Sequence, residues 1–285
     1  MRIDKQALLE KYVASLPVDS QKKYGAVAEE FLGKAEALDR EAVQEYVEWL
    51  RQEDFADGTI KWKFSVISRL FRVNNLDWPF RRGEAPTVFE LEEFRPALDP
   101  ELIKQMIDAA KAGKLSQEHA FYLAVSTLYG LRRGEMASLD AAHFDPNVTV
   151  IYIETLKHGR QRYHVIPEEV KPYIVPMAKG LRPCSVPTIN RRYHEIESAL
   201  GIEHIKDTGF HAIRRSLLHF LIENGTTEMS AQDFLRWKRD GSNMARRYHN
   251  VNLVGTKQAQ VGMGSADRLM DEEVFRTHPF LPMWR

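Results

Sequence analysis

The segment Leu128-Tyr-Gly-Leu-Arg-Arg-Gly-Glu-Met-Ala-Ser-Leu139 decides the fold of the second half of the chain. An apolar helical pattern runs up to Gly130, and a second helix is predicted with Arg132 in its first turn and Glu135 one turn later. Such a corner places a guanidinium beside the free backbone N–H groups of a helix start, which suits a phosphate. The same residues also fit an ordinary helix junction with a surface ion pair, so the downstream motifs must separate the two interpretations.

Further polar motifs follow this corner in a fixed order. Lys157 lies at the edge of a turn, His158-Gly159, between two predicted short strands, 148–155 and 162–166. A His-x-x-Arg pair comes next, and its members share one face of a helix because they are three residues apart. A Trp and a Tyr complete the polar set, which in chain order is Arg132, Lys157, His211, Arg214, Trp237 and Tyr248.

This set resembles the catalytic residues of the tyrosine recombinases, the family of lambda integrase and the Xer proteins. In that family the first Arg lies in a Gly-Leu-Arg-x-x-Glu segment, here residues 130–135, and a Lys lies on a β-hairpin. A His-x-x-Arg pair follows, then a His or Trp, and finally the nucleophilic Tyr. A single motif of this kind arises often by chance, whereas the complete set in the family's order is specific.

The sequence departs from the family pattern in two places. Trp237 stands eleven residues before Tyr248 in Leu-Arg-Trp, where the family usually carries Leu-Gly-His nearer to the Tyr. Either the loop is longer, with Trp237 at the His/Trp position, or Lys238 takes that position. We favour Trp237, because an indole N–H donates a hydrogen bond while its ring packs. The Tyr is followed directly by His249 and Asn250, where Tyr-x-His is common.

Two other tyrosines compete for the role of nucleophile. Tyr193 lies in Arg-Arg-Tyr-His, the same four residues that surround Tyr248, but it precedes the His-x-x-Arg pair. Its apolar neighbours form one face of an amphipathic helix that ends at Gly201, which indicates a structural or DNA-backbone role. Tyr163 is interpreted as a packing residue of the small sheet.

The resemblance implies a covalent mechanism on DNA. The Tyr248 phenol would attack the scissile phosphate and form a 3′-phosphotyrosine. Arg132 and Arg214 would each present a planar fork to the non-bridging oxygens. Lys157 resembles the family's general acid, and His211 would assist proton transfer or brace the phosphate.

Each of these residues also has a plainer interpretation. Glu135 is expected to orient Arg132 from behind. Lys157, taken alone, is more often a solvated turn residue, and Trp237 alone is more often part of a core.

No cofactor is expected, because the linkage energy stays in the phosphotyrosine. The sequence contains no phosphate-binding loop, no dinucleotide fingerprint and no clustered Asp/Glu metal set. Several histidines lie singly without ligand spacing and are interpreted as surface or satisfied core residues: His143, His158, His164, His204 and His219.

The bulk composition describes a globular protein of two domains. The chain has 285 residues, 44% of them hydrophobic, and a single cysteine, Cys184, so no internal disulfide forms. There is no membrane-length apolar run and no signal-peptide pattern, and we therefore expect a cytoplasmic protein.

The formal net charge of zero is unusual for a DNA-binding protein, but the cations are clustered. Residues 58–82 contain six cations and one anion, and residues 236–248 contain five cations and one anion. This distribution fits DNA bound on one face, although solvated helix faces would look the same. The candidate DNA contacts are Lys61, Lys63, Arg69, Arg72, Arg81, Arg82, Arg133, Arg160, Arg215 and Arg239.

The predicted fold class is mainly α in two domains. Residues 1–80 are expected to form a four-helix bundle, with helices at 5–15, 19–33, 40–52 and 59–74 and with Asp39 and Thr59 as N-caps. This bundle resembles the family's core-binding domain, which clamps DNA. Residues 81–97 form a linker.

Residues 98–264 are the expected catalytic domain, mostly helical with a small antiparallel sheet, and Asp99 and Pro100 open its first helix. The tail, 265–285, either docks on a neighbouring subunit, as the resemblance implies, or covers its own domain.

The resemblance thus implies a site-specific recombinase that acts on double-stranded DNA with paired half-sites, as a homotetramer on DNA and a monomer or dimer when free. The biological task would be integration, excision or dimer resolution. Two alternatives use the same surfaces. A type IB topoisomerase-like enzyme would relax supercoils with the same residues, and a non-catalytic relative would only hold DNA.

Overall fold

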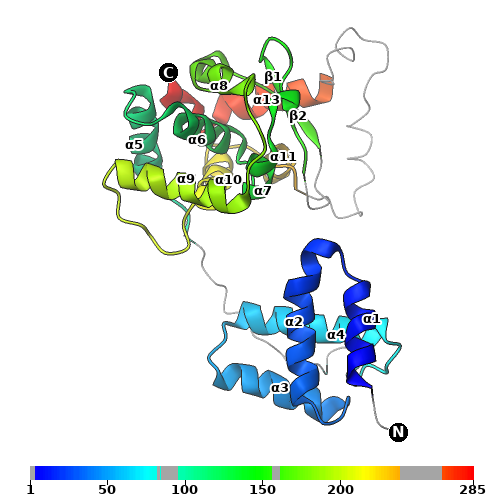
Figure 1. The fold of residues 1–285 in the computed structure, drawn as a ribbon. Helices are drawn as coiled ribbons and strands as arrows, with labels where there is room; N and C mark the ends of the chain where they lie inside the picture. Colours follow the sequence, from blue (N-terminus) through cyan, green and yellow to red (C-terminus); the bar gives the residue numbers. More distant parts are fainter. Residues whose placement is uncertain (1–3, 82–83, 85–95, 156–160, 238–264) are drawn as a thin grey trace. The chain divides into compact units, whose positions relative to one another are not determined.

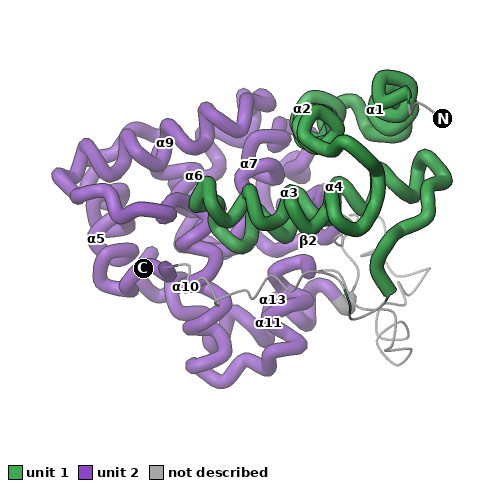
Figure 2. The backbone as a smooth tube through the Cα atoms, turned by 90° about the horizontal axis from the view of Figure 1, so that it is seen from below, with its two compact units in different colours: residues 1–94 green, residues 95–285 purple. Residues whose placement is uncertain are grey.

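The chain folds into two compact units, residues 1–94 and residues 95–285 (Figure 2). The structure is a computed structural model that describes residues 4–81, 84, 96–155, 161–237 and 265–285. It is mostly helical with one two-stranded antiparallel sheet, which confirms the predicted fold class (Figure 1). Among the helices of these ranges, none has the length and apolar character needed to span a bilayer.

Unit 1 is built from four helices whose apolar faces share one core. Phe31, Val43, Leu50 and Leu70 are fully buried in it. Each helix lies where the 3.6-residue periodicity predicts it, because a helix of this kind must bury its apolar stripe. The helices are α1 (Lys5–Ala14), α2 (Val18–Lys34), α3 (Arg40–Gln52) and α4 (Asp57–Val73).

The N-caps of unit 1 agree with the prediction at one helix and differ at another. The Asp39 side chain accepts a hydrogen bond from the Ala42 N–H and caps α3. The predicted cap Thr59 lies inside the first turn of α4 instead, because the helix begins two residues earlier, after Ala56.

Unit 2 is arranged around α6 (Gln117–Tyr129), in which every residue from 120 to 129 is buried. A helix that is apolar on all sides is stable only inside a core, and α5, α8, α9 and α10 surround it. The other helices of this unit are α5 (Pro100–Lys111), α7 (Arg133–Ser138), α8 (Lys171–Ala178), α9 (Val186–Ala199), α10 (Phe210–Glu223), α11 (Glu228–Phe234) and α13 (Ser265–Thr277). Asp99 caps α5 with Pro100 in its first turn, as predicted.

The sheet of unit 2 consists of β1 (Val150–Ile153) and β2 (Arg162–Val165), paired antiparallel with Val150 opposite Val165. Both strands are shorter than predicted. Val148 cannot extend β1 because its φ is +52°, which is not a strand conformation. The hairpin turn with Lys157, His158 and Gly159 lies outside the described residues.

The C-terminal segment packs on unit 2 of its own chain. The helix α13 lies against β2 and α11 (Figure 1), and the short 3-10 helix η4 (Leu281–Trp284) lies against α5. Val274 and Phe280 are fully buried. Trp284 donates a hydrogen bond of 3.1 Å from Nε1 to Thr127 in α6. This is the arrangement in which the tail covers its own domain.

Candidate active site

The site is built on the corner between α6 and α7. Gly130 ends α6 with φ +54°, and its N–H donates to the Ser126 carbonyl at 2.9 Å. A Cβ at this position would lie 2.7 Å from Leu235 Cδ2 and 3.3 Å from Arg214 Cγ. Only glycine fits, both for its conformation and for the space, and α10 and the segment after α11 therefore approach this corner closely.

Arg132 lies at the N-cap of α7, one position earlier than predicted, and is fixed by Glu135. The Arg132 N–H donates to Glu135 Oε2 at 2.8 Å, and its Nη1 donates to Glu135 Oε1 at 2.6 Å. The Arg132 side chain is 27% exposed whereas that of Glu135 is 1% exposed. The guanidinium thus reaches solvent while its partner is buried. Because α7 has only six residues, its N-terminus is expected to add little to the binding of an anion, and the Arg132 side chain is the main candidate for that role.

Arg214 projects from α10 into the same corner and is 4% exposed. Its Nη1 donates to the Gly130 carbonyl, and its Nη2 donates to the Leu235 carbonyl at 2.5 Å. Each terminal nitrogen keeps a second N–H. Burial, followed by the positive charges of Arg236 and Arg132, lowers the pKa of Arg214.

His211 lies near the start of α10 with its side chain exposed. Partial burial of the ring, the charge of Arg214 and the charges of three further arginines lower its pKa to about 4. The imidazole is therefore neutral at pH 7, and one ring nitrogen can accept a proton. The arginines that act on it include Arg132, so His211, Arg214 and Arg132 lie within electrostatic reach of one another.

Arg236 is a site residue that the sequence analysis missed. It is fully buried, with φ +59°. Its Nη2 donates to Glu135 Oε2 at 3.0 Å and to the Tyr129 carbonyl at 3.1 Å. Burial raises the pKa of Glu135, but the charge of Arg236, then the backbone hydrogen bond and charge of Arg132, outweigh it and lower the pKa to about 2. One carboxylate therefore holds two guanidinium groups.

The signal for Arg236 was present in the sequence, at the middle position of Leu-Arg-Trp, where the family carries glycine. The left-handed φ explains why glycine suits this position. From sequence alone, an arginine at this position is interpreted as a solvent-exposed residue. Only the fold shows that it pairs with the buried Glu135 carboxylate.

The polar contacts continue from Arg236 to the C-terminal helix. Arg236 Nη1 donates to His164 Nε2 at 3.1 Å, and His164 Nδ1 donates to Asp271 Oδ1 at 3.0 Å. Burial lowers the pKa of His164 to about 4, which outweighs the opposing effect of Asp271. A neutral imidazole with its proton on Nδ1 satisfies both contacts. The buried polar chain thus consists of Arg132, Glu135, Arg236, His164 and Asp271.

The remaining predicted catalytic residues are described only in part. Trp237 follows directly on this segment, and its indole is 37% exposed, so it does not belong to the core. Its backbone N–H donates to the Gln232 carbonyl at 3.0 Å. Lys157, Tyr248 and the alternative Lys238 lie outside the described residues.

The two competing tyrosines both have packing roles. Tyr193 is 1% exposed and stacks edge-on with Phe210, with ring centroids 5.3 Å apart. Burial raises the pKa of its phenol, which makes it a poor nucleophile. Tyr163 packs on Tyr152 at 4.7 Å across the sheet.

The candidate DNA contacts fall into different environments. Lys63 is a correction: it is 6% exposed and pairs with Glu30 at 2.7 Å inside unit 1, so it is unsuited to bind DNA. Arg215 donates to the Pro96 carbonyl at 2.6 Å and holds the chain before α5. Lys61, Arg72, Arg81 and Arg133 are exposed, and Arg69, which donates to the Ser15 carbonyl, is half-buried. Arg82, Arg160 and Arg239 lie outside the described residues.

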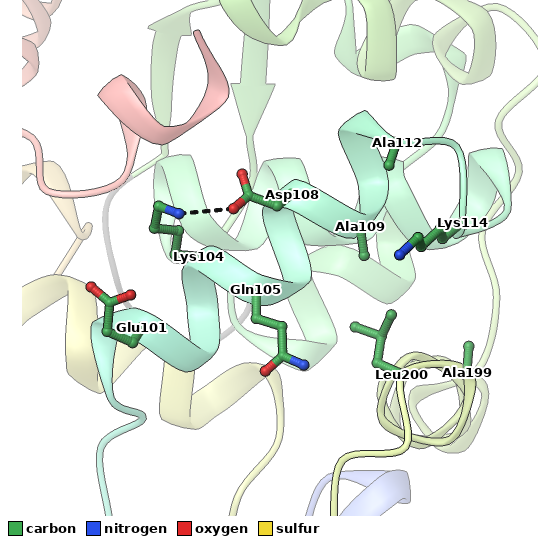
Figure 3. A pocket seen from close by; sticks show the side chains of 9 residues that line it. All are labelled: Glu101, Lys104, Gln105, Asp108, Ala109, Ala112, Lys114, Ala199 and Leu200. Carbon is green, nitrogen blue, oxygen red and sulfur yellow. Dashed lines mark hydrogen bonds and ion pairs between the residues drawn. The ribbon is translucent and has the colours of Figure 1, made fainter.

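A shallow pocket elsewhere in unit 2 contains none of these residues. It lies between α5 and the end of α9, and Lys104 and Asp108 form an ion pair of 2.9 Å at its edge (Figure 3). Leu200 closes the opposite side. The charged groups of its lining are Glu101, Lys104, Asp108 and Lys114.

The chain resembles known proteins in sequence and in fold. Residues 96–253 match the family model of the phage integrase family. Among solved structures, a lambda integrase dimer bound to a COC′ core site aligns with a TM-score of 0.62 and 17% identity, over 85% of this chain and 76% of that chain. The Tn1549 transposon integrase in complex with a circular intermediate DNA aligns with a TM-score of 0.62 and 14% identity, over 81% and 92% of the two chains.

At such low sequence identities, these structural alignments establish a shared fold and nothing more. A search of curated proteins finds no match. The family model covers more than half of the sequence, including the corner at Arg132 and the His211–Arg214 pair. The chain therefore belongs to the phage integrase family of tyrosine site-specific recombinases.

Proposed function

We propose that this protein cleaves and rejoins duplex DNA through a 3′-phosphotyrosine on Tyr248, without metal or ATP. The observation that carries the proposal is the convergence of Arg132 and Arg214 on one corner, with His211 in electrostatic reach of both. Phosphoryl transfer depends mainly on positioning and on stabilising charge at the non-bridging oxygens. Two guanidinium groups held by buried hydrogen bonds provide both.

Each residue then has a defined role. Arg132 and Arg214 bind the non-bridging oxygens with their remaining N–H groups. Neutral His211 accepts or returns the proton of the attacking phenol. Lys157 protonates the departing 5′ oxygen, and the Trp237 indole donates a hydrogen bond to the phosphate. Glu135 and Arg236 hold Arg132 in place and do not touch the substrate.

The partner is double-stranded DNA with paired half-sites. In solved structures, lambda integrase occurs as a dimer bound to a core site and as a tetramer bound to a Holliday junction. By analogy, we propose that the present chain forms a homotetramer on DNA and that unit 1 clamps the duplex. We also propose that the protein acts in the cytoplasm. The reaction then exchanges strands because the phosphotyrosine can be attacked by a hydroxyl from another duplex.

The test is covalent trapping on a nicked suicide substrate. The cognate DNA is first obtained by sequencing fragments that are crosslinked to the protein in cells with formaldehyde, a step that does not depend on the covalent chemistry under test. Wild type is expected to form a protein–DNA adduct, and Tyr248→Phe is expected to form none, while Tyr163→Phe serves as the matched control. An adduct from Tyr248→Phe would overturn the assignment of the nucleophile.

Two other outcomes would point to a different function. Relaxation of a supercoiled plasmid without the cognate site would indicate a topoisomerase. Absence of any adduct from wild type on its cognate DNA would indicate a DNA-binding protein without this chemistry.

A further inference from the structure

We propose that unit 2 contains a transition-metal site of the zinc class, formed by His194, Glu197 and His204. The first two residues lie one turn apart on α9, and His204 lies in the segment between α9 and α10. His194 Nδ1 is 3.1 Å from Glu197 Oε2, and His204 Nδ1 is 2.9 Å from the same oxygen. All three ligand atoms lie within 4.8 Å of one another.

The spacing suits a small tetrahedral ion. Zinc binds imidazole nitrogen and carboxylate oxygen at about 2.0–2.2 Å, which places neighbouring ligand atoms of a tetrahedron about 3.3 Å apart. The two nitrogen–oxygen distances already lie near that value, and all three ligand atoms lie within 4.8 Å of one another. Closing the cluster by at most about 1.5 Å would therefore admit the ion. Two imidazoles with one carboxylate favour zinc, cobalt or nickel over calcium or magnesium, which prefer oxygen ligands.

The burial of the ligands supports a site over a chance surface cluster. The Glu197 side chain is buried, with 4% of the residue exposed, and a carboxylate is seldom buried without a positively charged partner or a metal ion. His194 and His204 are its ion-pair partners, and the Tyr193 phenol, whose pKa is raised by burial, lies close enough for the Glu197 charge to raise that pKa further. The two imidazole rings meet edge to face at 4.6 Å and keep 54% and 44% of their side chains exposed. An ion can therefore reach the buried carboxylate from solvent.

The site would tie the segment after α9 to that helix. Residues 203–207 are exposed, and they lead to Gly209, the N-cap of α10. His211 follows seven residues after His204. A metal bound to His204 would thus restrain the start of the helix that carries His211 and Arg214, at a distance from the scissile phosphate.

Cobalt absorption provides the direct test, because tetrahedral Co²⁺ gives strong visible bands that octahedral aqueous Co²⁺ lacks. The full-length protein, stripped with a chelator, is titrated with Co²⁺ and then with Zn²⁺, in a Cys184→Ser background that removes the thiol as a ligand. We expect one equivalent of Co²⁺ to produce the bands and Zn²⁺ to displace it. His194→Asn and His204→Asn should each lower the affinity at least tenfold.

The matched control is His219→Asn. His219 is exposed and forms an ion pair with Glu223 at 3.1 Å on α10, so it is an equally accessible imidazole next to a carboxylate, without a third ligand. It should leave the titration unchanged. Bands that persist in both His194→Asn and His204→Asn, or no binding by wild type at micromolar metal, would overturn the site. The assay needs no DNA, so its result is independent of the proposed recombination chemistry.

Discussion

At the scale of single residues, the corner at Gly130 is the most demanding position of the site. Its backbone is left-handed and its missing side chain makes room for Leu235 and Arg214. A substitution there lowers the free energy of unfolding for two reasons, an unfavourable left-handed backbone and a steric clash in the core. The two effects can be separated, because Gly113 has a left-handed backbone but open space around it.

We therefore expect Gly130→Ala to destabilise the protein by about 2–4 kcal/mol, the sum of a left-handed alanine and an overpacked core. Gly113→Ala is the control, since Gly113 has φ +69° with open space around its Cβ. It should cost only about 1 kcal/mol. Urea unfolding measures both. Equal losses would mean that Leu235 and Arg214 move aside freely and that the corner is not tightly packed.

Arg236 tests the buried ion pair with Glu135. Arg236→Gly and Arg236→Ala both leave a buried carboxylate with one partner fewer, at a cost of about 3–5 kcal/mol. The glycine variant should be about 1 kcal/mol more stable than the alanine variant, because φ is +59° at this position.

A positioning role for Arg236 has its own signature. The charge of Arg236 is the main factor that lowers the pKa of Glu135 to about 2. Wild type loses the stabilisation from this carboxylate as the pH falls from its unfolded value of 4.5 towards 2. In Arg236→Gly the folded-state pKa of Glu135 should rise, so this loss should still begin near pH 4.5 but should end at higher pH and be smaller. The rate of covalent adduct formation should also fall. If the pH dependence of stability below about pH 4.5 were the same in Arg236→Gly and wild type, Arg236 would not act on Glu135 and could not help to position Arg132.

At the scale of elements, the docking of the C-terminal helix depends on histidines that are buried in their neutral form. His278 is fully buried, and its Nε2 donates to the Leu128 carbonyl at 2.9 Å. Burial lowers its pKa to about 4. The unfolded chain takes up a proton below its ordinary pKa of 6.5, so the folded state loses stability as the pH falls from 6.5 to 4.

This loss should approach about 3 kcal/mol for one such histidine. Urea unfolding at several pH values measures it as a slope. His278→Gln should be less stable at pH 7 but should show a flatter slope, whereas His219→Gln, which changes an exposed histidine, should retain that of wild type. A slope unaffected by His278→Gln would show that this imidazole takes up a proton as readily in the folded protein as in the unfolded chain.

The elements were largely predictable from the sequence, and the contacts that join them were not. Periodicity predicted the helices of unit 1 because their apolar residues recur with the helical repeat. The strands were predicted too long because the left-handed Val148 leaves no trace in hydropathy. The His164–Asp271 contact joins residues 107 positions apart, and no local pattern indicates which carboxylate a buried histidine will meet.

The candidate site followed the same division. Arg132, His211 and Arg214 were identifiable because each lies in a short motif with a fixed spacing. Arg236 was missed, and Lys63 was assigned to DNA although it is buried against Glu30. In both cases the charge of the residue was visible in the sequence and its depth in the fold was not.

At the scale of the whole molecule, charge is balanced in number and clustered in sequence. The chain has 40 cationic and 40 anionic side chains. Binding to DNA depends on the cations that replace counterions at the phosphates and not on the net charge. A neutral protein can therefore bind DNA with a steep dependence on salt.

We expect the logarithm of the DNA-binding constant to fall with the logarithm of salt concentration with a slope on the order of −5, as for about six phosphate contacts. Arg72→Gln, which removes an exposed cation of α4, should reduce the steepness by about 1. Lys179→Gln, an exposed cation outside the candidate set, should not. Fluorescence anisotropy measures each slope. A flat titration for wild type would contradict binding through these cations.

The burial of Asp271, Phe280 and Trp284 in unit 2 has a consequence for synthesis. Residues 132, 135 and 236 emerge from the ribosome before the helix that completes their surroundings. A nascent chain therefore holds these arginines and Glu135 without the Asp271 carboxylate and without the final layer of the core. Unit 1 can fold while translation continues, whereas the core of unit 2 is complete only after residues 271–284 have left the exit tunnel. Unit 2 therefore reaches its final packing later than unit 1.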